Sequence, residues 1–493
     1  MASAKKPFYI TTTLPYVNAS PHIGFALELV QADVVARFHA MRGEEVVFNT
    51  GVDEHGAKIY RKALEAGKNP QEYVDEYAKQ FEALNNALSA SVTNFIRTTD
   101  PHHERAAQEF WRRCEKNGDI YKKTYAVKYC VGCELEKTDS ELESGRCPIH
   151  PHLELETLEE ENYFFRFSRY EASLRRWYAE HPDCVLPQFR MHEIDAFAKR
   201  GFLDFSISRL KEKMPWGIPV PGDESQVMYV WFDALINYIS TLGWPEDEKH
   251  FEEYWGTVEE PRAVQIAGKD NLRQQAAMWQ AMLLSAGLPL SKRVLIHGFL
   301  TSGGQKMSKS LGNVVDPFSV VKTYGTDPVR YFLLREIPSD EDGDFSEDQL
   351  KKRYQGDLAN GLGNFVARVV TLGEQLSPLA GGTIDSRIEK EIGAARDAIA
   401  RNIEAFKLHE AVAALWQLIQ FGDGYVNEKK PWAISDAAEK AEAVFNLVVL
   451  LDNIAALLVP FLPGTAQKIT SCLRWKGDRL HVTKGENLFP RLS

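Results

Sequence analysis

Long apolar runs, internal repeats and a positive net charge are all missing from this chain of 493 residues. Because no stretch of about 18 apolar residues occurs, we expect no helix that spans a membrane. The N-terminal residues MASAKKPFYI lack the apolar core of a secretory signal, so we expect a cytoplasmic protein. The formal net charge of −11 excludes a uniformly basic protein that coats nucleic acid, while a local basic surface can still bind RNA.

The stretch from Thr11 to Phe25, TTTLPYVNASPHIGF, predicts a strand, a turn and the start of a helix. Its β-branched beginning favours extended backbone, and its two prolines prevent an early helix. From Ile23 onward, apolar residues recur at spacings of three and four, as on one face of a helix. His22 and Gly24 therefore lie at a helix N-terminus, where a phosphate binds well. The alternative is an ordinary capping or surface histidine.

A second segment, GGQKMSKS at 303–310, forms a glycine-led loop with Lys306 and Lys309 three residues apart. Alone, such a pair of lysines is typical of a solvated loop. Together, PHIGF and KMSKS resemble the two signatures of class I aminoacyl-tRNA synthetases. The further blocks GVDEHG, VWFDA, GKD and KMSKSLGN follow one another as in methionyl-tRNA synthetases, and this resemblance covers nearly the whole chain.

The resemblance implies an α/β fold: a Rossmann-like parallel sheet, a zinc-bearing insertion and an α-helical bundle that binds the anticodon. The residues themselves predict strands at 46–48, 227–232, 263–267 and 294–296, and long amphipathic helices after about residue 355. We expect five segments: the first half of the catalytic domain at 1–115, the insertion at 116–222, the second catalytic half at 223–313, a stem-contact module at 314–354 and the helical domain at 355–493.

The activity implied by the resemblance is the ATP-dependent activation of L-methionine and its transfer to tRNA(Met), including the initiator tRNA. Mg²⁺ accompanies ATP. The implied ATP-binding residues are His22, Gly24, Gly268, Asp270, His297, Lys306 and Lys309, of which His22, Lys306 and Lys309 are the catalytic ones.

The implied methionine pocket consists of Leu14, Tyr16, Asp53, Trp231, Ala234, Leu235, Tyr238, Asn271 and Gln275. Asp53 follows a strand, where ligands bind in open parallel sheets, and its carboxylate suits the α-ammonium group. Aromatic rings suit the polarizable thioether. Without the resemblance, Asp53 is equally a helix-capping residue, and the aromatic residues are more often core.

Four potential metal ligands lie in the insertion: Cys130 and Cys133 in one C-x-x-C, then Cys147 and His150. Such a set closes a tetrahedral zinc site, whereas disulfides are rare in a cytosolic chain. The resemblance implies one structural zinc that helps to place the acceptor end of tRNA. The other cysteines stand singly and are expected to be buried.

The helical domain places Asn364 and Arg368 one helical turn apart and offers Trp432 as a stacking platform beside Pro431. These four positions match the anticodon readers of the family, although a generic helical bundle is the ordinary interpretation. Since no dimerising domain follows residue 491, we expect a monomer.

Three positions depart from the family pattern. Phe25 stands where the first signature usually has its second histidine. If nothing replaces the hydrogen bond that this histidine donates, the activation step would lose about 3 kcal/mol of transition-state stabilisation. Asn271 and Gln275 stand where isoleucine and histidine are common. Asn271 and Gln275 leave open an altered amino-acid specificity, and Phe25 leaves open a catalytically weakened tRNA-binding relative. A small-molecule adenylyltransferase with the same nucleotide fold is a further alternative, although it has no use for anticodon readers.

Overall fold

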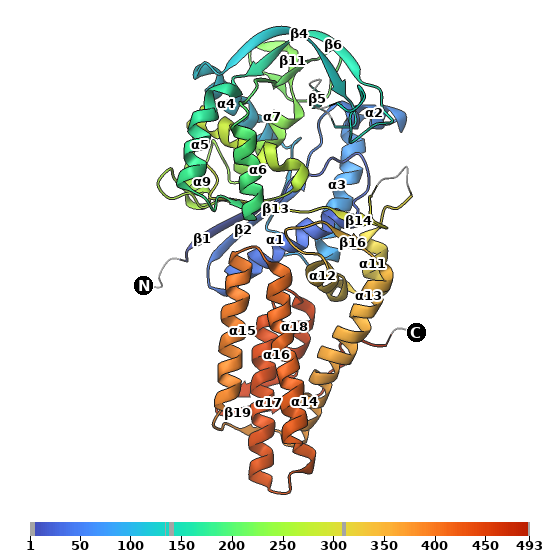
Figure 1. The fold of residues 1–493 in the computed structure, drawn as a ribbon, viewed down its shortest axis with the longest axis vertical. Coiled ribbons are helices and arrows are strands. Elements are labelled where there is room, and N and C mark those ends of the chain that lie inside the picture. Colours follow the sequence, from blue (N-terminus) through green and yellow to red (C-terminus); the bar gives the residue numbers. More distant parts are fainter. Residues whose placement is uncertain (1–4, 134, 138–141, 308–311, 492–493) are drawn as a thin grey trace. The chain divides into compact units, whose positions relative to one another are not determined.

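The computed structural model describes the chain except for residues 1–4, 134, 138–141, 308–311 and 492–493 (Figure 1). The chain divides into two compact units. The first unit contains residues 1–21, 44–83 and 92–296, and the second contains residues 22–43, 84–91 and 297–493.

A six-stranded sheet forms the centre of the first unit, with the strands in the order β3-β2-β1-β12-β13-β7. The pairs β3–β2, β2–β1, β1–β12 and β13–β7 are all parallel. The strands are β1 (Pro7–Thr11), β2 (Glu45–Val52), β3 (Asn94–Arg97), β7 (Val185–Leu186), β12 (Val264–Gly268) and β13 (Arg293–His297). The order reverses direction at β1, which is where open parallel sheets bind ligands.

The helices in the sequence range of this unit are mostly short. They are α2 (Ala57–Glu65), α3 (Pro70–Ala87), α4 (Pro101–Lys116), α5 (Glu171–Glu180), α6 (Gln188–Ala198), α7 (Val230–Leu235), α8 (Asn237–Ser240), α9 (Glu248–Trp255) and α10 (Trp279–Ser285). A π-helical turn at Gln274–Met278 runs directly into α10. Such turns are rare and often occur at functional sites.

Two smaller sheets are formed by the region expected to be an insertion, 116–222, together with β11, which begins directly after it. One has the order β5-β4-β6-β8, formed by β4 (Ile120–Cys130), β5 (Leu135–Lys137), β6 (Glu156–Phe165) and β8 (Phe205–Ser206). The other has the order β10-β11-β9, formed by β9 (Ser208–Leu210), β10 (Pro219–Val220) and β11 (Asp223–Met228). Within the same region, β7 pairs with β13 in the central sheet.

The strand predicted at 227–232 is wrong. The strand β11 ends at Met228 and belongs to an antiparallel sheet, and helix α7 begins at Val230. A short apolar run does not distinguish a buried strand from a buried helix. Trp231 therefore lies on a helix. The other three predicted strands correspond to β2, β12 and β13, and α1 (Ile23–Met41) begins at the predicted residue.

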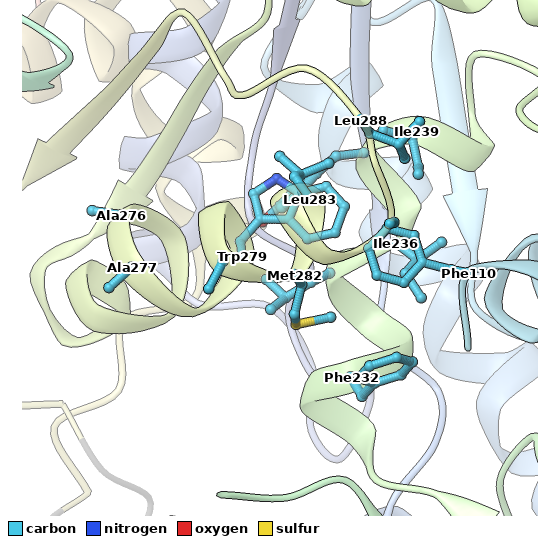
Figure 2. Close-up of a cluster of buried hydrophobic side chains, with 14 of the residues drawn as sticks. Phe110, Phe232, Ile236, Ile239, Ala276, Ala277, Trp279, Met282, Leu283 and Leu288 are labelled. Atoms are coloured by element: carbon cyan, nitrogen blue, oxygen red, sulfur yellow. The ribbon is translucent and has the colours of Figure 1, made fainter. Parts of the chain in front are cut away.

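An aromatic core fixes the elements that carry the predicted methionine-binding residues (Figure 2). Phe110 of α4 contacts Phe232 of α7 edge-on, with ring centroids 5.9 Å apart, and stacks on Trp279 at 5.7 Å. All three side chains are fully buried. Replacing one such ring with alanine typically costs about 3–5 kcal/mol, so α7 and the start of α10, which directly follows the π-helical turn, are held firmly.

The second unit begins with α1 and continues with a three-stranded sheet and three helices: β14 (Leu300–Ser302), β15 (Gln305–Lys306), β16 (Gly343–Phe345), α11 (Pro317–Tyr324), α12 (Thr326–Arg335) and α13 (Glu347–Arg353). Mostly longer helices follow: α14 (Asn364–Gln375), α15 (Ser386–Glu404), α16 (Leu408–Lys429), α17 (Ala437–Leu458) and α18 (Pro463–Ser471). The helical expectation after residue 355 misses one feature, a small sheet formed by β17 (Leu379–Ala380), β18 (Leu473–Lys476) and β19 (Arg479–Val482).

Helix α17 is long and apolar enough to cross a membrane by length and composition alone. Its most apolar window is 67% buried within the protein, as in the core helix of a bundle. Among the described residues it is the only helix that passes this test.

Candidate active site and metal centre

The segment Asp53-Glu54-His55 follows β2, and each of its side chains has a different partner. Asp53 is 3% exposed, and its Oδ1 accepts a hydrogen bond from the backbone N–H of His55 at 3.3 Å. Glu54 accepts from Arg97 Nε at 2.8 Å, and His55 Nδ1 lies 3.0 Å from Asp233 Oδ2 on α7. These contacts hold the segment in one conformation at the carboxyl end of β2.

Two other predicted pocket residues, Leu14 and Tyr16, lie in the extended segment after β1. Tyr16 pairs with Asp53 through an isolated parallel bridge. The Asp53 N–H donates to the Pro15 carbonyl at 3.0 Å, and the Val17 N–H donates to the Asp53 carbonyl at 3.2 Å. The backbone thus places Tyr16 beside Asp53, as the sequence predicts for two strand ends at one edge of a sheet.

Helices α7 and α8 contribute Trp231, Ala234, Leu235 and Tyr238. Tyr238 is 2% exposed, and its phenol accepts a hydrogen bond from Gln275 Nε2 at 2.7 Å. The Trp231 indole N–H is buried and has no acceptor in the part of the chain that the structure describes.

The two unusual residues of the GKDNLRQQ segment have different surroundings. Gln275 is 2% exposed, and besides Tyr238 it contacts Gln265, whose Nε2 donates to Gln275 Oε1 at 3.2 Å. Asn271 is only partly buried, and its Nδ2 lies 3.4 Å from Asp270 Oδ1. Gln275 is therefore part of a buried neutral network, while Asn271 contacts the exposed Asp270 that follows β12.

In the second unit, His22 caps helix α1. The Gly24 N–H donates to His22 Nδ1 at 3.1 Å, so this nitrogen is the unprotonated one. A Cβ on Gly24 would lie 2.8 Å from the His22 ring, which is why glycine is needed here. Phe25 stacks on the same ring with centroids 4.3 Å apart. The histidine is thus both a cap and a fixed group at a helix N-terminus.

The segment after the lysine loop lies beside this helix start. The Ile23 N–H donates to the Val315 carbonyl at 3.0 Å, and Asn313 Nδ2 donates to the Ser302 carbonyl at 3.3 Å across the base of the loop. Lys306 lies in β15, paired with Thr301 of β14, whereas Lys309 lies outside the described residues.

His297 is 6% exposed and lies between two oxygen atoms of the second unit. Its Nδ1 is 2.7 Å from the Gly298 carbonyl, and its Nε2 is 2.8 Å from Glu28 Oε2. Of the other predicted ATP-binding residues, Gly268 and Asp270 belong to the first unit, and His22, Gly24 and Lys306 belong to the second.

The predicted metal ligands lie together at the end of β4. The ligand atoms of Cys130, Cys133, Cys147 and His150 are all within 4.8 Å of one another. Cys133 Sγ is 3.4 Å from Cys147 Sγ and 3.2 Å from His150 Nδ1. With metal–sulfur bonds of about 2.3 Å, ligands around zinc lie roughly 3.5–3.8 Å apart, so the set fits a tetrahedral ion. A Cβ on Gly132 would lie 2.5 Å from the His150 ring, so glycine permits this approach.

The predicted anticodon readers lie within the second unit. Arg368 of α14 donates to Asn427 Oδ1 at 2.7 Å, lies 3.4 Å from Asp423 Oδ1, and has its guanidinium 5.6 Å from the Trp432 ring centroid. Trp432 is 55% exposed, and its neighbour in the chain, Pro431, is buried. Asn364 is exposed at the start of α14. We name Arg368, Asp423, Asn427 and Trp432 the α14–α16 cluster.

Three buried residues next to the predicted pocket did not stand out in the sequence. Asp233 and His103 are fully buried, and Ser291 connects Gln265 to Gln280. A signal existed for Asp233, since it is a charged residue inside the apolar run VWFDA. Nothing in the sequence pairs it with His55 and His103, which are far from it along the chain.

The comparisons with known proteins agree with this geometry. The family described as tRNA synthetases class I (M) matches residues 8–154 and 152–370, and the anticodon-binding domain of tRNA ligase matches residues 385–486. Asn364 and Arg368 thus lie in the first match, and Trp432 lies in the second. Together with the parallel sheet and the helical domain, these matches define the chain as a class I tRNA synthetase.

Individual relatives narrow the assignment within this class. The methionine–tRNA ligase of Thermotoga maritima is 40% identical over 94% of this chain and 74% of the relative, and that of Rhizobium meliloti is 40% identical over 96% and 93%. The structure of Mycobacterium tuberculosis methionyl-tRNA synthetase in complex with methionyl-adenylate has a TM-score of 0.92 and 34% identity, covering 99% of this chain and all of that one. The chain belongs to the methionine–tRNA ligase family.

Proposed function

We propose that the chain activates L-methionine with ATP, forms methionyl-adenylate, and transfers the methionyl group to the terminal ribose of tRNA(Met), including the initiator tRNA. The observation that carries this proposal is the likeness, over nearly the whole chain, to a structure that holds methionyl-adenylate. The predicted pocket residues around Asp53 and Tyr238 are of types that suit methionine, which supports the same reaction.

In the first step, the methionine carboxylate attacks the α-phosphorus of ATP and pyrophosphate leaves. Asp53 holds the α-ammonium group, while Tyr16, Trp231 and Tyr238 surround the thioether side chain.

The ATP-binding residues act by orientation and by stabilising charge rather than by covalent chemistry. His22, Lys306 and Lys309 contact the triphosphate, with Gly24, Gly268, Asp270 and His297 completing the nucleotide site. Because His22 Nδ1 accepts from Gly24, the ring proton sits on Nε2, which becomes the donor to a phosphate. Phe25 supports the ring by stacking in place of a second donor. Mg²⁺ enters with ATP as part of the substrate.

In the second step, the 2′-hydroxyl of the terminal ribose attacks the carbonyl carbon of methionyl-adenylate, the ester forms, and AMP leaves. Asn364, Arg368, Pro431 and Trp432 read the anticodon by edge hydrogen bonds and stacking. Cys130, Cys133, Cys147 and His150 would hold one structural zinc, whose contribution is to fix the shape of this region for the acceptor end of tRNA. We place the enzyme in the cytoplasm, where tRNA is charged.

The test is amino-acid-dependent exchange of pyrophosphate into ATP, with methionine and each other amino acid in parallel. Exchange with methionine alone is the expected result, and it means that Phe25, Asn271 and Gln275 are compatible with catalysis. Exchange with a different amino acid contradicts the assigned pocket. Absence of exchange from folded protein that still binds tRNA contradicts the activity.

The lysine loop has its own test. Lys309→Ala is expected to slow adenylate formation by about a hundredfold, while methionine binding in the absence of ATP stays unchanged. Equal activation rates for the variant and the parent would remove this lysine from the mechanism.

A further inference from the structure

A fully buried carboxylate in the first unit has two histidines as its partners. Asp233 Oδ2 lies 3.0 Å from His55 Nδ1, and Asp233 Oδ1 lies 3.7 Å from His103 Nε2. The side chains are 0%, 4% and 0% exposed for Asp233, His55 and His103. A buried charge is expensive unless it is paired, so the arrangement needs an explanation.

The His55 residue connects this carboxylate to the predicted methionine pocket. Its ring contacts Asp233, and its own backbone N–H donates to Asp53 Oδ1 at 3.3 Å. The Trp216 ring lies edge-on to His55 with centroids 5.6 Å apart, and its indole N–H donates to the Glu54 carbonyl at 2.6 Å. His55 therefore links the position of α7 to that of the Asp53 carboxylate.

The other end of the cluster reaches α8. His103 Nδ1 is 2.9 Å from Ser240 Oγ, which itself donates to the Asn237 carbonyl at 3.4 Å. The hydroxyl therefore accepts from His103 Nδ1. His103 and Ser240 thus link the cluster to the helix that carries Tyr238, another predicted pocket residue.

We propose that Asp233 is a positioning residue for recognition of the α-ammonium group of methionine, acting through His55 on Asp53. The proposal rests on the proposed function, in which Asp53 binds that ammonium group. The two histidines face the two oxygens of the Asp233 carboxylate, so Asp53 is the carboxylate that meets the ligand. A carboxylate held in one orientation before binding loses less freedom when the ligand arrives.

A comparison of two methionine analogues distinguishes a positioning role of Asp233 from simple stabilisation of the core. Methioninol keeps the ammonium group and lacks the carboxylate, whereas 4-(methylthio)butanoate keeps the carboxylate and the side chain and lacks the ammonium group. Their inhibition constants are measured by competition with methionine in pyrophosphate exchange. A variant that merely loosens the pocket weakens both, and a variant that disturbs Asp53 weakens methioninol selectively.

For Asp233→Asn we expect methioninol to bind about tenfold more weakly, with less than a twofold change for 4-(methylthio)butanoate, a coupling usual within one hydrogen-bond network. Asp119→Asn is the matched control. Asp119 is also a fully buried carboxylate of the first unit, but its partners are Tyr170, Ser285 and Arg169. It should change both constants equally or not at all.

Equal losses for both analogues in Asp233→Asn, or no loss, would overturn the proposal. If Asp233→Asn does not fold, His55→Gln gives the same contrast, because an amide side chain cannot reproduce the imidazole contact with Asp233. Asp53→Asn distinguishes the proposed role of Asp53 in ammonium binding from the positioning role of Asp233. Equal losses in Asp53→Asn refute the proposed role of Asp53, whereas selective loss in Asp53→Asn but not in Asp233→Asn refutes the positioning role alone.

Discussion

The predicted methionine pocket buries its polar groups, whereas the α14–α16 cluster lies at the protein surface. In the pocket, Asp53 and Tyr238 are 3% and 2% exposed, and protein groups bind them before any ligand arrives. In the α14–α16 cluster, Trp432 is 55% exposed, and Arg368 is held by partners at the surface. A buried, fixed site suits a small ligand of one shape, and an exposed aromatic and a guanidinium suit unstacked bases.

Loss of the predicted zinc site should have the largest effect on local structure, while sparing both the predicted methionine pocket and the α14–α16 cluster. Cys147→Ser is expected to abolish binding of one zinc ion and to unfold the segment around residues 130–150, because zinc contributes about 10–16 kcal/mol to such folded segments. Metal content and limited proteolysis measure this. Cys472→Ser, at a buried cysteine of the second unit, should keep both unchanged. Well-folded parent protein without metal would contradict the zinc site.

Removing Gln275 from its buried hydrogen-bond network should destabilise the protein more than removing its neighbour Gln274. Gln275→Leu leaves the Tyr238 phenol and Gln265 without their shared partner, which should lower the free energy of unfolding by about 1–3 kcal/mol and raise KM for methionine. Gln274→Leu is the control, because the Gln274 Oε1 has no partner among the described residues. Denaturant unfolding checks both variants. Equal losses would mean that burial alone matters at this turn.

An exposed site should lose binding without losing stability. Arg368→Met keeps the apolar stem and removes the contacts with Asn427, Asp423 and Trp432. We expect about a tenfold loss in tRNA charging efficiency, unchanged pyrophosphate exchange, and a change in unfolding free energy within about 1 kcal/mol. Arg387→Met, at another surface ion pair of the same unit, is the control. Parallel loss of exchange would contradict the separation of the two regions.

The effect spread over the widest range of conditions is a pH dependence of stability. Burial by itself lowers the pKa of His55, but Asp233, together with Glu104 and Glu54, raises it overall. Burial likewise raises the pKa of Asp233, but His55 and His103 lower it overall. The histidine therefore stabilises the fold below its ordinary pKa of about 6.5, and this contribution is lost as the pH rises through its folded value.

The aspartate contribution is present above its ordinary pKa of about 3.9 and is lost as the pH falls. The pair thus stabilises most between about pH 4 and 6.5. Denaturant unfolding between pH 6 and 9 should show stability falling by up to about 1.4 kcal/mol per pH unit, and Asp233→Asn should flatten the slope. An unchanged slope in that variant would exclude this pair as its source.

The sequence predicted local features well where one short pattern decides them. Apolar spacing located the start of α1, and the spacing of Cys130, Cys133, Cys147 and His150 anticipated a cluster that the structure brings together. It failed at 227–232, because an apolar run of six residues fits a buried strand and a buried helix equally.

Pairings between distant residues could not be read from the sequence. The His55–Asp233 contact joins residues 178 positions apart, and no periodicity encodes it. The same holds for the contact between Gln275 and Tyr238, 37 positions apart. The unusual Gln275 was recognised as a departure, but only the fold reveals the network that it completes. Motifs thus gave the residue types of the site, and tertiary packing gave their partners.

The division of tasks between the two regions is tested most directly by two variants in two assays. Asp53→Asn should lose about a hundredfold in methionine-dependent pyrophosphate exchange, since it removes a buried carboxylate opposite an ammonium group, and should bind tRNA as the parent does. Trp432→Ala should exchange normally and lose roughly tenfold or more in charging. Trp475→Ala, at another exposed tryptophan of the second unit, should be normal in both assays. If Asp53→Asn and Trp432→Ala each impair both assays equally, the account is wrong.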